Sequence, residues 1–198
     1  MTTMIIPHPP RLHCFSSTWS RFMAIPEFRP AEFLNDLLAP LPCFSFPPTS
    51  FVQPGEVSEP SRTLLVHNHH MTVTLEAHYG SPLRVEVLER VRLGDSYTRR
   101  ICLYETGKNV PVLYGVVRIH LQFCKDGVRE RILAEREPLG RILIQNGVLT
   151  RIDLLGLLKI ESSAVPGDWF GNRGGDVFGR LAVIHCDDQP AIELLEMV

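Results

Sequence analysis

The second half of the chain alternates apolar and polar positions in a way that predicts strands. From Leu83 to Val91, apolar residues recur near a period of two while charged Arg and Glu residues stand between them. This pattern is typical of a half-buried strand. Tyr97 to Tyr104 and Val110 to Phe123 flank Glu105-Thr-Gly-Lys-Asn109, a polar loop with glycine. These two segments therefore predict a β-hairpin.

The same alternation continues to the C-terminus. Thr150 to Ile160 is a further strand-like segment. Phe178 to His185 and Ala191 to Val198 surround the turn sequence Asp187-Asp-Gln-Pro190, so they predict a second hairpin. Successive hairpins favour a single α+β domain, with an antiparallel sheet of about six strands and helices packed on it.

Helical signals lie between the predicted strands. Pro30 to Leu38 has a proline entry, an early acid and apolar residues at helical spacing, so a short helix is expected there. Asp126 to Arg136 is typical of a helix with mixed charge, and Pro138 stands where a first-turn proline begins another.

Met71 to His78 is ambiguous on local grounds. Thr72 to Leu75 favours a strand by propensity, yet Met71, Leu75 and His78 lie on one helical face. Gly80 is placed to end a helix. Both interpretations remain open from these residues alone.

The N-terminal third predicts a different organisation. Residues 1 to about 30 carry much of the proline, and Leu41 to Pro60 is rich in Pro, Ser and Phe, so both are expected to be irregular. We therefore divide the chain into a Pro-rich extension with one short helix, residues 1–60, and a folded domain, residues 61–198.

Composition limits the classes of partner. The chain has 198 residues, 44% apolar and 21% charged, which suits one globular domain. Its formal charge of −2 offers no basic surface for nucleic acid or an anionic membrane. No apolar run reaches the roughly 18 to 20 residues that span a bilayer. We expect a chain that binds neither nucleic acid nor membrane.

The cysteines favour a reducing compartment. Cys14, Cys43, Cys102, Cys124 and Cys186 are odd in number and include no Cys-x-x-Cys pair. They are typical of free thiols, so we expect a cytoplasmic protein, and a monomer.

His67-Asn-His-His70 is the sequence cluster that most resembles a metal site. On a strand, His67 and His69 would share a face, whereas on a helix none of the three is ideally spaced. No Cys or carboxylate stands at companion spacing, and a zinc site needs three or four converging ligands. We predict no metal and keep a histidine metal site as an alternative.

Two charged residues are candidates for an internal binding site. Period-two parity places Arg99 on the same strand face as Ile101 and Leu103, while Arg100 points the other way. A guanidinium that faces the core needs a carboxylate or an anionic ligand. Glu196 shares a strand face with Ile192 and Leu194, but parity alone does not decide whether that face is buried.

Taken together, these segments resemble the chorismate lyase family, from about Leu64 to Val198. The motifs occur in the family's order: Met71-Thr72, the Arg-x-Ile-x-Leu strand from Arg99, Pro138-Leu-Gly-Arg-Ile-Leu143, Leu149-Thr-Arg151, and a Gln-Pro hairpin that ends in Glu196. The pair Pro-Leu-Gly-Arg and Leu-Thr-Arg is the most specific part.

The resemblance implies a chorismate pyruvate-lyase that leaves 4-hydroxybenzoate and uses no cofactor. It implies that Arg99 pairs with the aromatic carboxylate, and that Glu196 meets the departing ether oxygen as a proton donor or hydrogen-bond partner. Backbone N–H groups of Met71 and Leu139 would complete the substrate site. It also favours the helix for Met71 to His78. The alternative from another class is a non-catalytic domain of the same fold that senses a small aromatic acid.

Overall fold

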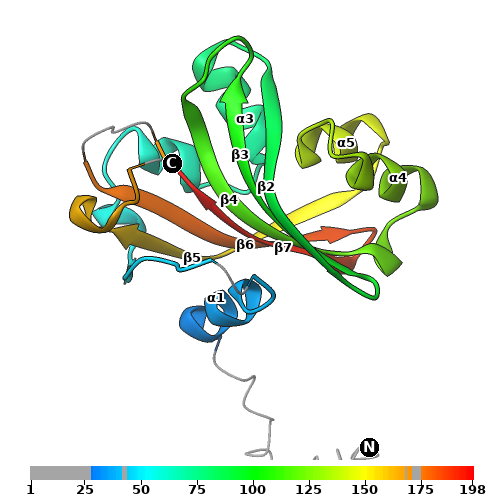
Figure 1. Ribbon diagram of the computed structural model, residues 1–198, viewed down its shortest axis with the longest axis horizontal. Coiled ribbons are helices and arrows are strands. Elements are labelled where there is room, and N and C mark those ends of the chain that lie inside the picture. The colour runs from blue at the N-terminus through cyan, green and yellow to red at the C-terminus, as the bar shows by residue number, and fades with distance from the viewer. Residues whose placement is uncertain (1–27, 42–43, 168, 171–174) are drawn as a thin grey trace, which may run out of the picture.

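A computed structural model describes residues 28–41, 44–167, 169–170 and 175–198. They form one domain around a seven-stranded antiparallel sheet with the strand order β1-β5-β6-β7-β4-β3-β2 (Figure 1). The predicted single α+β domain is therefore confirmed, with seven strands where about six were expected. The strands are β1 (Ser50–Val52), β2 (Leu83–Leu93), β3 (Ser96–Glu105), β4 (Pro111–His120), β5 (Thr150–Ile160), β6 (Val177–Cys186) and β7 (Gln189–Met197).

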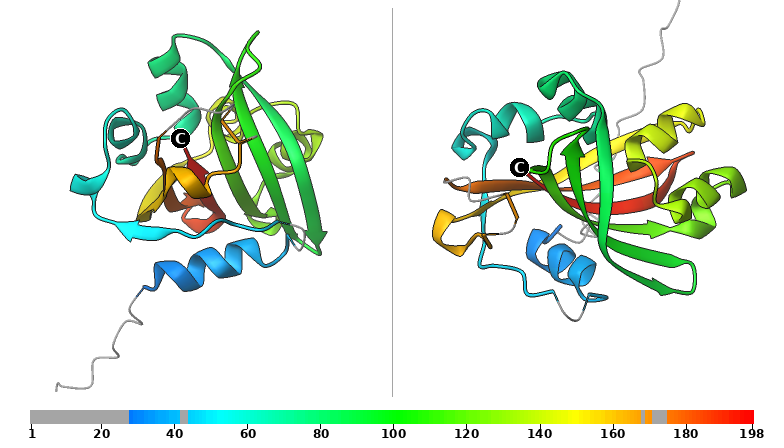
Figure 2. Two further views of the ribbon diagram at one scale, coloured as in Figure 1. Left: turned by 60° about the vertical axis from the view of Figure 1, so that its left-hand side comes forward. Right: turned by 45° about the horizontal axis from the view of Figure 1, so that its top comes forward.

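Helices lie on both faces of the twisted sheet. The single helix α1 lies below it, and α3, α4 and α5 lie above it (Figures 1 and 2). The α-helices are α1 (Pro30–Leu38), α2 (Ser61–Leu65), α3 (Met71–Tyr79), α4 (Asp126–Ala134) and α5 (Leu139–Gln145), and the 3-10 turns are η1 (Pro54–Glu56), η2 (Leu121–Phe123) and η3 (Ser162–Ala164).

Most of the predicted elements are present at the expected residues. Both hairpins form, and Asp187 and Asp188 take the left-handed conformation in the turn between β6 and β7. The strand predicted from Val110 to Phe123 ends earlier, because the chain turns into η2 after His120.

The strand interpretation of Thr72–Leu75 is wrong, and the helix is confirmed as α3. Gly80 adopts φ 64° and caps the helix, and its N–H bonds the carbonyl of Glu76. Met71 and Leu75 pack into the hydrophobic core, so tertiary burial outweighs the β-propensity of the threonines and valine.

Residues 41–60 are not irregular throughout. Ser50 to Val52 form β1, which pairs with β5 at the edge of the sheet. In this pairing, Ser50 lies opposite Lys159. The domain boundary at residue 60 stays a prediction, and the first 27 residues of the predicted extension lie outside the described residues, as do Cys14 and Cys43. The described cysteines, Cys102, Cys124 and Cys186, are buried and form no disulfide with one another.

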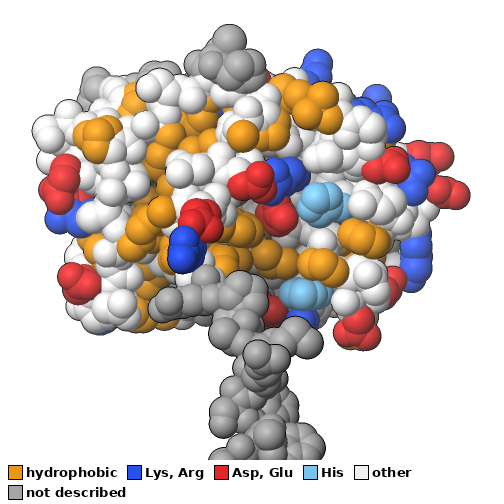
Figure 3. Space-filling view, turned by 90° about the horizontal axis from the view of Figure 1, so that it is seen from below, with side chains coloured by type: hydrophobic (Ala, Val, Ile, Leu, Met, Phe, Trp, Pro, Cys, Tyr) orange, Lys and Arg blue, Asp and Glu red, His pale blue; other side chains and the backbone are white. Residues whose placement is uncertain are grey.

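The lower face of the sheet carries a hydrophobic layer that α1 helps to cover. Leu34 and Leu37 lie one helical turn apart and pack against Tyr114, Val116 and Leu195 of the sheet. An ion pair between Asp36 and Arg118 fastens the helix at its polar side. Figure 3 looks onto this side of the molecule, where hydrophobic side chains run between charged groups.

The upper face packs against the other helices and carries the candidate site. Ile132 of α4 and Ile142 of α5 are completely buried in one core cluster with strands β3, β4, β6 and β7. Leu65 and Leu75 belong to a second cluster under α2 and α3. Between these two clusters, the N-termini of α3 and α5 meet above the sheet. No helix among the described residues is long and apolar enough to cross a membrane.

Candidate functional site

A small cavity lies between the upper face of the sheet and the first residues of α3 and α5. The empty space in it and at its mouth is about 430 Å³, and only about 30 Å³ can hold the centre of a water molecule. The space is therefore narrow. We call it the central cavity; it is lined by His70, Met71, Thr72, Ile101, Leu103, Val117, Pro138, Leu139, Gly140, Arg180, Ile184, Leu194 and Glu196.

The glycine of Pro-Leu-Gly-Arg sets the distance between the two helices at the cavity. A Cβ atom on Gly140 would lie 2.9 Å from Thr72 Oγ1 and 3.2 Å from the Cβ of His70. A side chain at this position would therefore collide with the start of α3. The motif needs glycine for close helix packing, since its backbone is ordinary helix.

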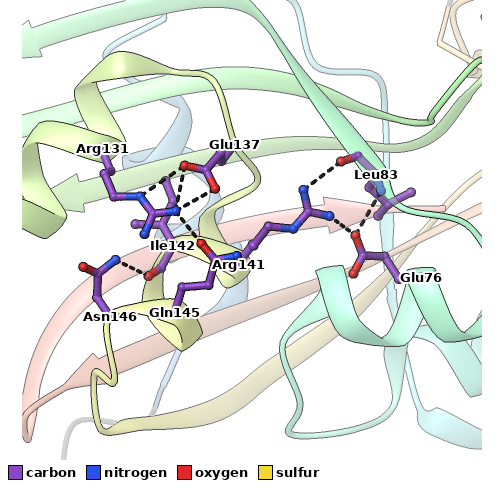
Figure 4. Close-up of polar contacts among 8 residues, drawn as sticks. All are labelled: Glu76, Leu83, Arg131, Glu137, Arg141, Ile142, Gln145 and Asn146. Atoms are coloured by element: carbon purple, nitrogen blue, oxygen red, sulfur yellow. Dashed lines mark hydrogen bonds and ion pairs between the residues drawn. The ribbon is translucent and has the colours of Figure 1, made fainter.

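The arginine of the same motif links three elements (Figure 4). Arg141 of α5 forms an ion pair with Glu76 of α3, and its Nη1 donates to the carbonyl of Leu83 at the start of β2, 3.3 Å away. Glu76 in turn accepts a hydrogen bond from the Leu83 N–H at 3.0 Å. Glu137, just before the motif, accepts from Arg131 Nη2 at 2.7 Å, which joins α4 to α5. The motif thus builds one wall of the cavity.

Strand register brings Arg99 and Glu196 to the same face of the sheet. Arg99 of β3 lies opposite Val117 of β4, and Val117 lies opposite Leu194 of β7. Two residues along, Gly115 lies opposite both Ile101 and Glu196. Strands are about 4.8 Å apart, so β3 and β7, with β4 between them, are roughly 10 Å apart.

Arg99 is completely buried next to the cavity wall. Its side chain is 0% exposed, and its Nη1 reaches the carbonyl of Ile132 only at 3.5 Å. Its Nε and Nη2 have no hydrogen-bond partner among the described residues. Burial lowers the pKa of Arg99, although Tyr97 and Glu135 nearby favour the charged form. An arginine keeps its proton under such conditions, so this is a buried cation with unused donors.

Arg100 lies on the opposite face of β3. Its Nε pairs with Glu89 at 3.2 Å, and its Nη1 donates to the hydroxyl of Tyr114. The structure therefore gives the two neighbouring arginines different environments, as strand parity requires. Of the two, Arg99 is the one beside the central cavity.

Glu196 faces the cavity but is held by a second buried arginine. Arg180 of β6 lies directly opposite Glu196, and its Nε donates to Glu196 Oε2 at 2.7 Å. Arg180 is 1% exposed, and it also donates to the carbonyls of His67 and His69 at 3.0 and 3.3 Å. One arginine therefore fixes Glu196 and the loop before α3 together.

The histidines of that loop point to separate partners. His67 Nε2 contacts the carbonyl of Leu64 at 2.7 Å, whereas His70 Nε2 contacts Thr150 Oγ1 at 2.9 Å. Burial lowers the pKa of both rings. Among the described residues, no group of three or more His, Cys, Asp or Glu is arranged to hold a metal ion. The contact with Thr150 also gives the Leu-Thr-Arg motif a local role.

Three of the four predicted site residues come from distant parts of the chain and meet in the lining of the central cavity, whereas Arg99 is not among the lining residues. Met71, Leu139 and Glu196 line the central cavity, and Arg99 lies beside its wall residue Val117. Sequence reasoning missed Arg180, and it considered His70 only as a possible metal ligand. Arg180 could have been found by parity, because it alternates with Phe178, Ala182 and Ile184 on one face of β6. His70 gave no such signal, since its role depends on contact with Thr150.

Comparison with known proteins shows a remote structural likeness. No family model and no curated protein matches the sequence. PhnF from Mycobacterium smegmatis is similar with a TM-score of 0.44 and 14% identity, over 67% of this chain and 64% of that chain. A possible transcriptional regulator, YydK from Bacillus subtilis subsp. subtilis str. 168, has a TM-score of 0.39 and 10% identity, over 58% and 56%. Both matches span less than two thirds of the other chain.

These findings correct the prediction of an enzyme. At these identities the likeness concerns the fold alone. The prediction of a chorismate pyruvate-lyase is contradicted: the two similar solved structures are PhnF and a possible transcriptional regulator, and neither description names a lyase. In the structure, Oε2 of Glu196 already accepts a hydrogen bond from Nε of Arg180. The binding roles of Arg99, Met71, Leu139 and Glu196 stay predictions.

Proposed function

We propose that this chain is a non-catalytic domain that binds a small aromatic acid in the central cavity. One observation carries the proposal: Arg99 is completely buried, and two of its nitrogen atoms lack a hydrogen-bond partner among the described residues. An unpaired buried guanidinium is costly, and a ligand carboxylate would offset this cost with a bidentate contact. The unfilled donors therefore favour an anionic ligand.

The walls of the cavity suit a flat ring. Ile101, Leu103, Val117 and Leu194 supply apolar surface, and the small volume of the cavity disfavours bulky groups. Met71 and Leu139 are the first residues of α3 and α5, where backbone N–H groups have no partner within the helix. These amides can donate to a ligand oxygen. A hydroxybenzoate combines all three features.

Calorimetric titration with 4-hydroxybenzoate tests the proposal. The wild-type chain should bind it, and Arg99→Gln should weaken binding at least tenfold, because one charge-assisted hydrogen bond contributes about 1.5–3 kcal/mol. Arg100→Gln is the matched control, since Arg100 faces the other side of the sheet, and it should bind as the wild type does. Equal losses in the two variants would contradict the assignment of the carboxylate to Arg99.

Incubation with chorismate separates binding from turnover. We expect no release of pyruvate by a preparation that binds 4-hydroxybenzoate, whereas a chorismate lyase assayed in parallel releases it. Release of pyruvate at a comparable rate would overturn the non-catalytic assignment. Absence of binding to every aromatic acid tried would overturn the proposed function itself.

A further inference from the structure

The edge of the sheet beside β5 is only partly covered. β1 pairs with Leu157, Leu158 and Lys159 of β5, and the chain then turns into η1. Residues Thr150 to Gly156 of β5 lie against β6 on one side and, within the described part of the chain, against no strand on the other. Backbone N–H and C=O groups along such an edge can pair with a further strand.

Four side chains follow one another along the lower side of this edge. Leu149 is 69% exposed and continues the strand, since its carbonyl accepts from the N–H of Asp187 at 2.9 Å. Arg151 and Asp153 come next on the same face by parity. Leu155 packs against the lower hydrophobic layer. The order along the edge is therefore apolar, positive, negative, apolar.

The two charges in this row are free to change partners. Arg151 Nη2 lies 3.3 Å from Asp153 Oδ2, and the same carboxylate oxygen lies 3.0 Å from His185 Nε2. The side chains of Arg151 and Asp153 are 67% and 42% exposed. Because water screens ion pairs at such exposure, a different partner for either charge costs little.

A shallow groove lies where the uncovered edge meets β1. It has about 270 Å³ of space for the centres of water-sized spheres, and most of the residues around it are apolar. They include Pro30, Phe51, Pro54, Leu154 and Leu155, and Phe51 is 41% exposed. An apolar side chain from a neighbouring strand can therefore leave water there.

We propose that two copies of this chain associate through this edge as an antiparallel pair of β5 strands. In a two-fold pair centred on Ile152, Arg151 of each copy lies opposite Asp153 of the other. Leu149 of each copy lies opposite Leu155 of the other, beside the groove. A two-fold axis uses each contact twice, so two cross-strand ion pairs and two apolar contacts form.

The charges on the edge select this register. If the centre moves to Arg151, the two Arg151 side chains lie directly opposite each other. If it moves to Asp153, the two Asp153 carboxylates do so. Like charges directly opposite each other destabilise a strand pair. Charged side chains often protect a sheet edge from unspecific pairing, and here they leave one register in which opposite charges meet.

The expected dimer is weak and reversible. A pair of seven-residue strands is roughly 24 Å long. A stable complex usually buries about 800 Å² of each partner, which so short a contact does not provide. The monomer expected from composition is then the state at low concentration. The inference is independent of any ligand in the central cavity.

Sedimentation equilibrium of the full chain tests the association. Between about 5 and 500 µM, we expect the average mass to rise from that of a monomer towards that of a dimer. Arg151→Asp places like charges opposite each other and should weaken association at least tenfold. Arg92→Asp makes the same charge change on β2, at the other edge of the sheet, and should leave association as in the wild type. A monomer at every concentration would overturn the proposal.

An exchange of the two charges tests the register. Asp153→Arg alone should weaken association at least tenfold, whereas Arg151→Asp combined with Asp153→Arg restores opposite charges and should return it to within threefold of the wild type. A double variant as weak as the single ones would contradict the register. Leu149→Ser changes an exposed side chain and should weaken association at least threefold, so it decides the question if the charge variants do not fold. Unchanged association in Leu149→Ser and Arg151→Asp would place the contact elsewhere.

Discussion

At the scale of single residues, the motif Pro-Leu-Gly-Arg contributes space and contacts. Gly140 lets α5 approach the start of α3, and Arg141 holds the two helices and β2 together. Its leucine faces the cavity as the first residue of α5. The side chains of the motif therefore position a wall, and the charged groups of the site come from other strands.

Gly140→Ala tests the close approach. The added Cβ would lie 2.9 Å from Thr72 Oγ1, and neither the buried threonine nor the backbone near it can move freely. We expect a loss of about 1–3 kcal/mol in the free energy of unfolding, measured with urea, as for other overpacked sites. Gly127→Ala in α4 is the control, because nothing lies within 4 Å of the new Cβ, and its stability should not fall. Equal stability of both variants would show that the packing is not limiting.

Because His70 is partly buried, we expect the stability of the folded chain to depend on pH. Burial lowers its pKa below 6.5 in the folded chain, although Glu196 opposes the shift. The unfolded chain then binds more protons once the pH falls below about 6.5, so stability decreases in that range and is level above it. Melting temperatures between about pH 7.5 and pH 5 should fall less in His70→Gln than in the wild type. Parallel curves would exclude His70 as the source.

At the scale of elements, the sequence predicted the hairpins well and the edge of the sheet poorly. Strands β2 to β7 each span nine to eleven residues, so their apolar patterns and the turns between them can be recognised without any tertiary contact. β1 has three residues in a Pro- and Phe-rich segment and exists because β5 offers it an unpaired edge. The sequence of α3 was ambiguous because it also depends on tertiary contacts. Its local preferences allow a strand or a helix, and the burial of its residues in the core decides for the helix.

Leu37→Ala tests whether α1 belongs to the same cooperative unit as the sheet. Leu37 is completely buried against the lower face, so its truncation should cost about 2–5 kcal/mol in a single unfolding transition. Asn35→Ala, at an exposed position of the same helix, should change the stability by at most about 0.5 kcal/mol. If α1 were an independent extension, neither change would affect the unfolding of the sheet.

At the scale of the whole molecule, the site is a meeting point of residues that lie up to 126 positions apart, from His70 to Glu196. The lining of this site includes residues of both core clusters of the upper face, so we expect the proposed ligand to stabilise the domain as a unit. The cytoplasmic location, the monomeric state and the absence of nucleic-acid or membrane partners stay predictions from composition.

Thermal unfolding with added ligand tests this coupling. At a free 4-hydroxybenzoate concentration about 100 times its dissociation constant, mass action stabilises the folded state by about 2.7 kcal/mol. For a domain of this size we expect the melting temperature to rise by roughly 5–10 °C. Arg99→Gln should show little or no rise at the same concentration. A rise of equal size in that variant would place the ligand elsewhere.

The sequence by itself determined the α+β class, the strands β2 to β7, the placement of Arg99 on one strand face with Ile101 and Leu103, and the order of the motifs. These features follow from the periodicity and parity of neighbouring residues in the sequence. They can be recognised without knowing which distant segments pack together. Only the tertiary structure decided that Glu196 faces the cavity, that Arg180 pairs with it, and that Arg99 forms no ion pair within the described part of the chain. Whether a buried charge is paired depends on which side chains lie next to each other on neighbouring strands. The register between the strands decides this, as it does for Arg180 and Glu196. For that reason an acid that suggested catalysis in the sequence becomes, in the folded chain, half of an ion pair.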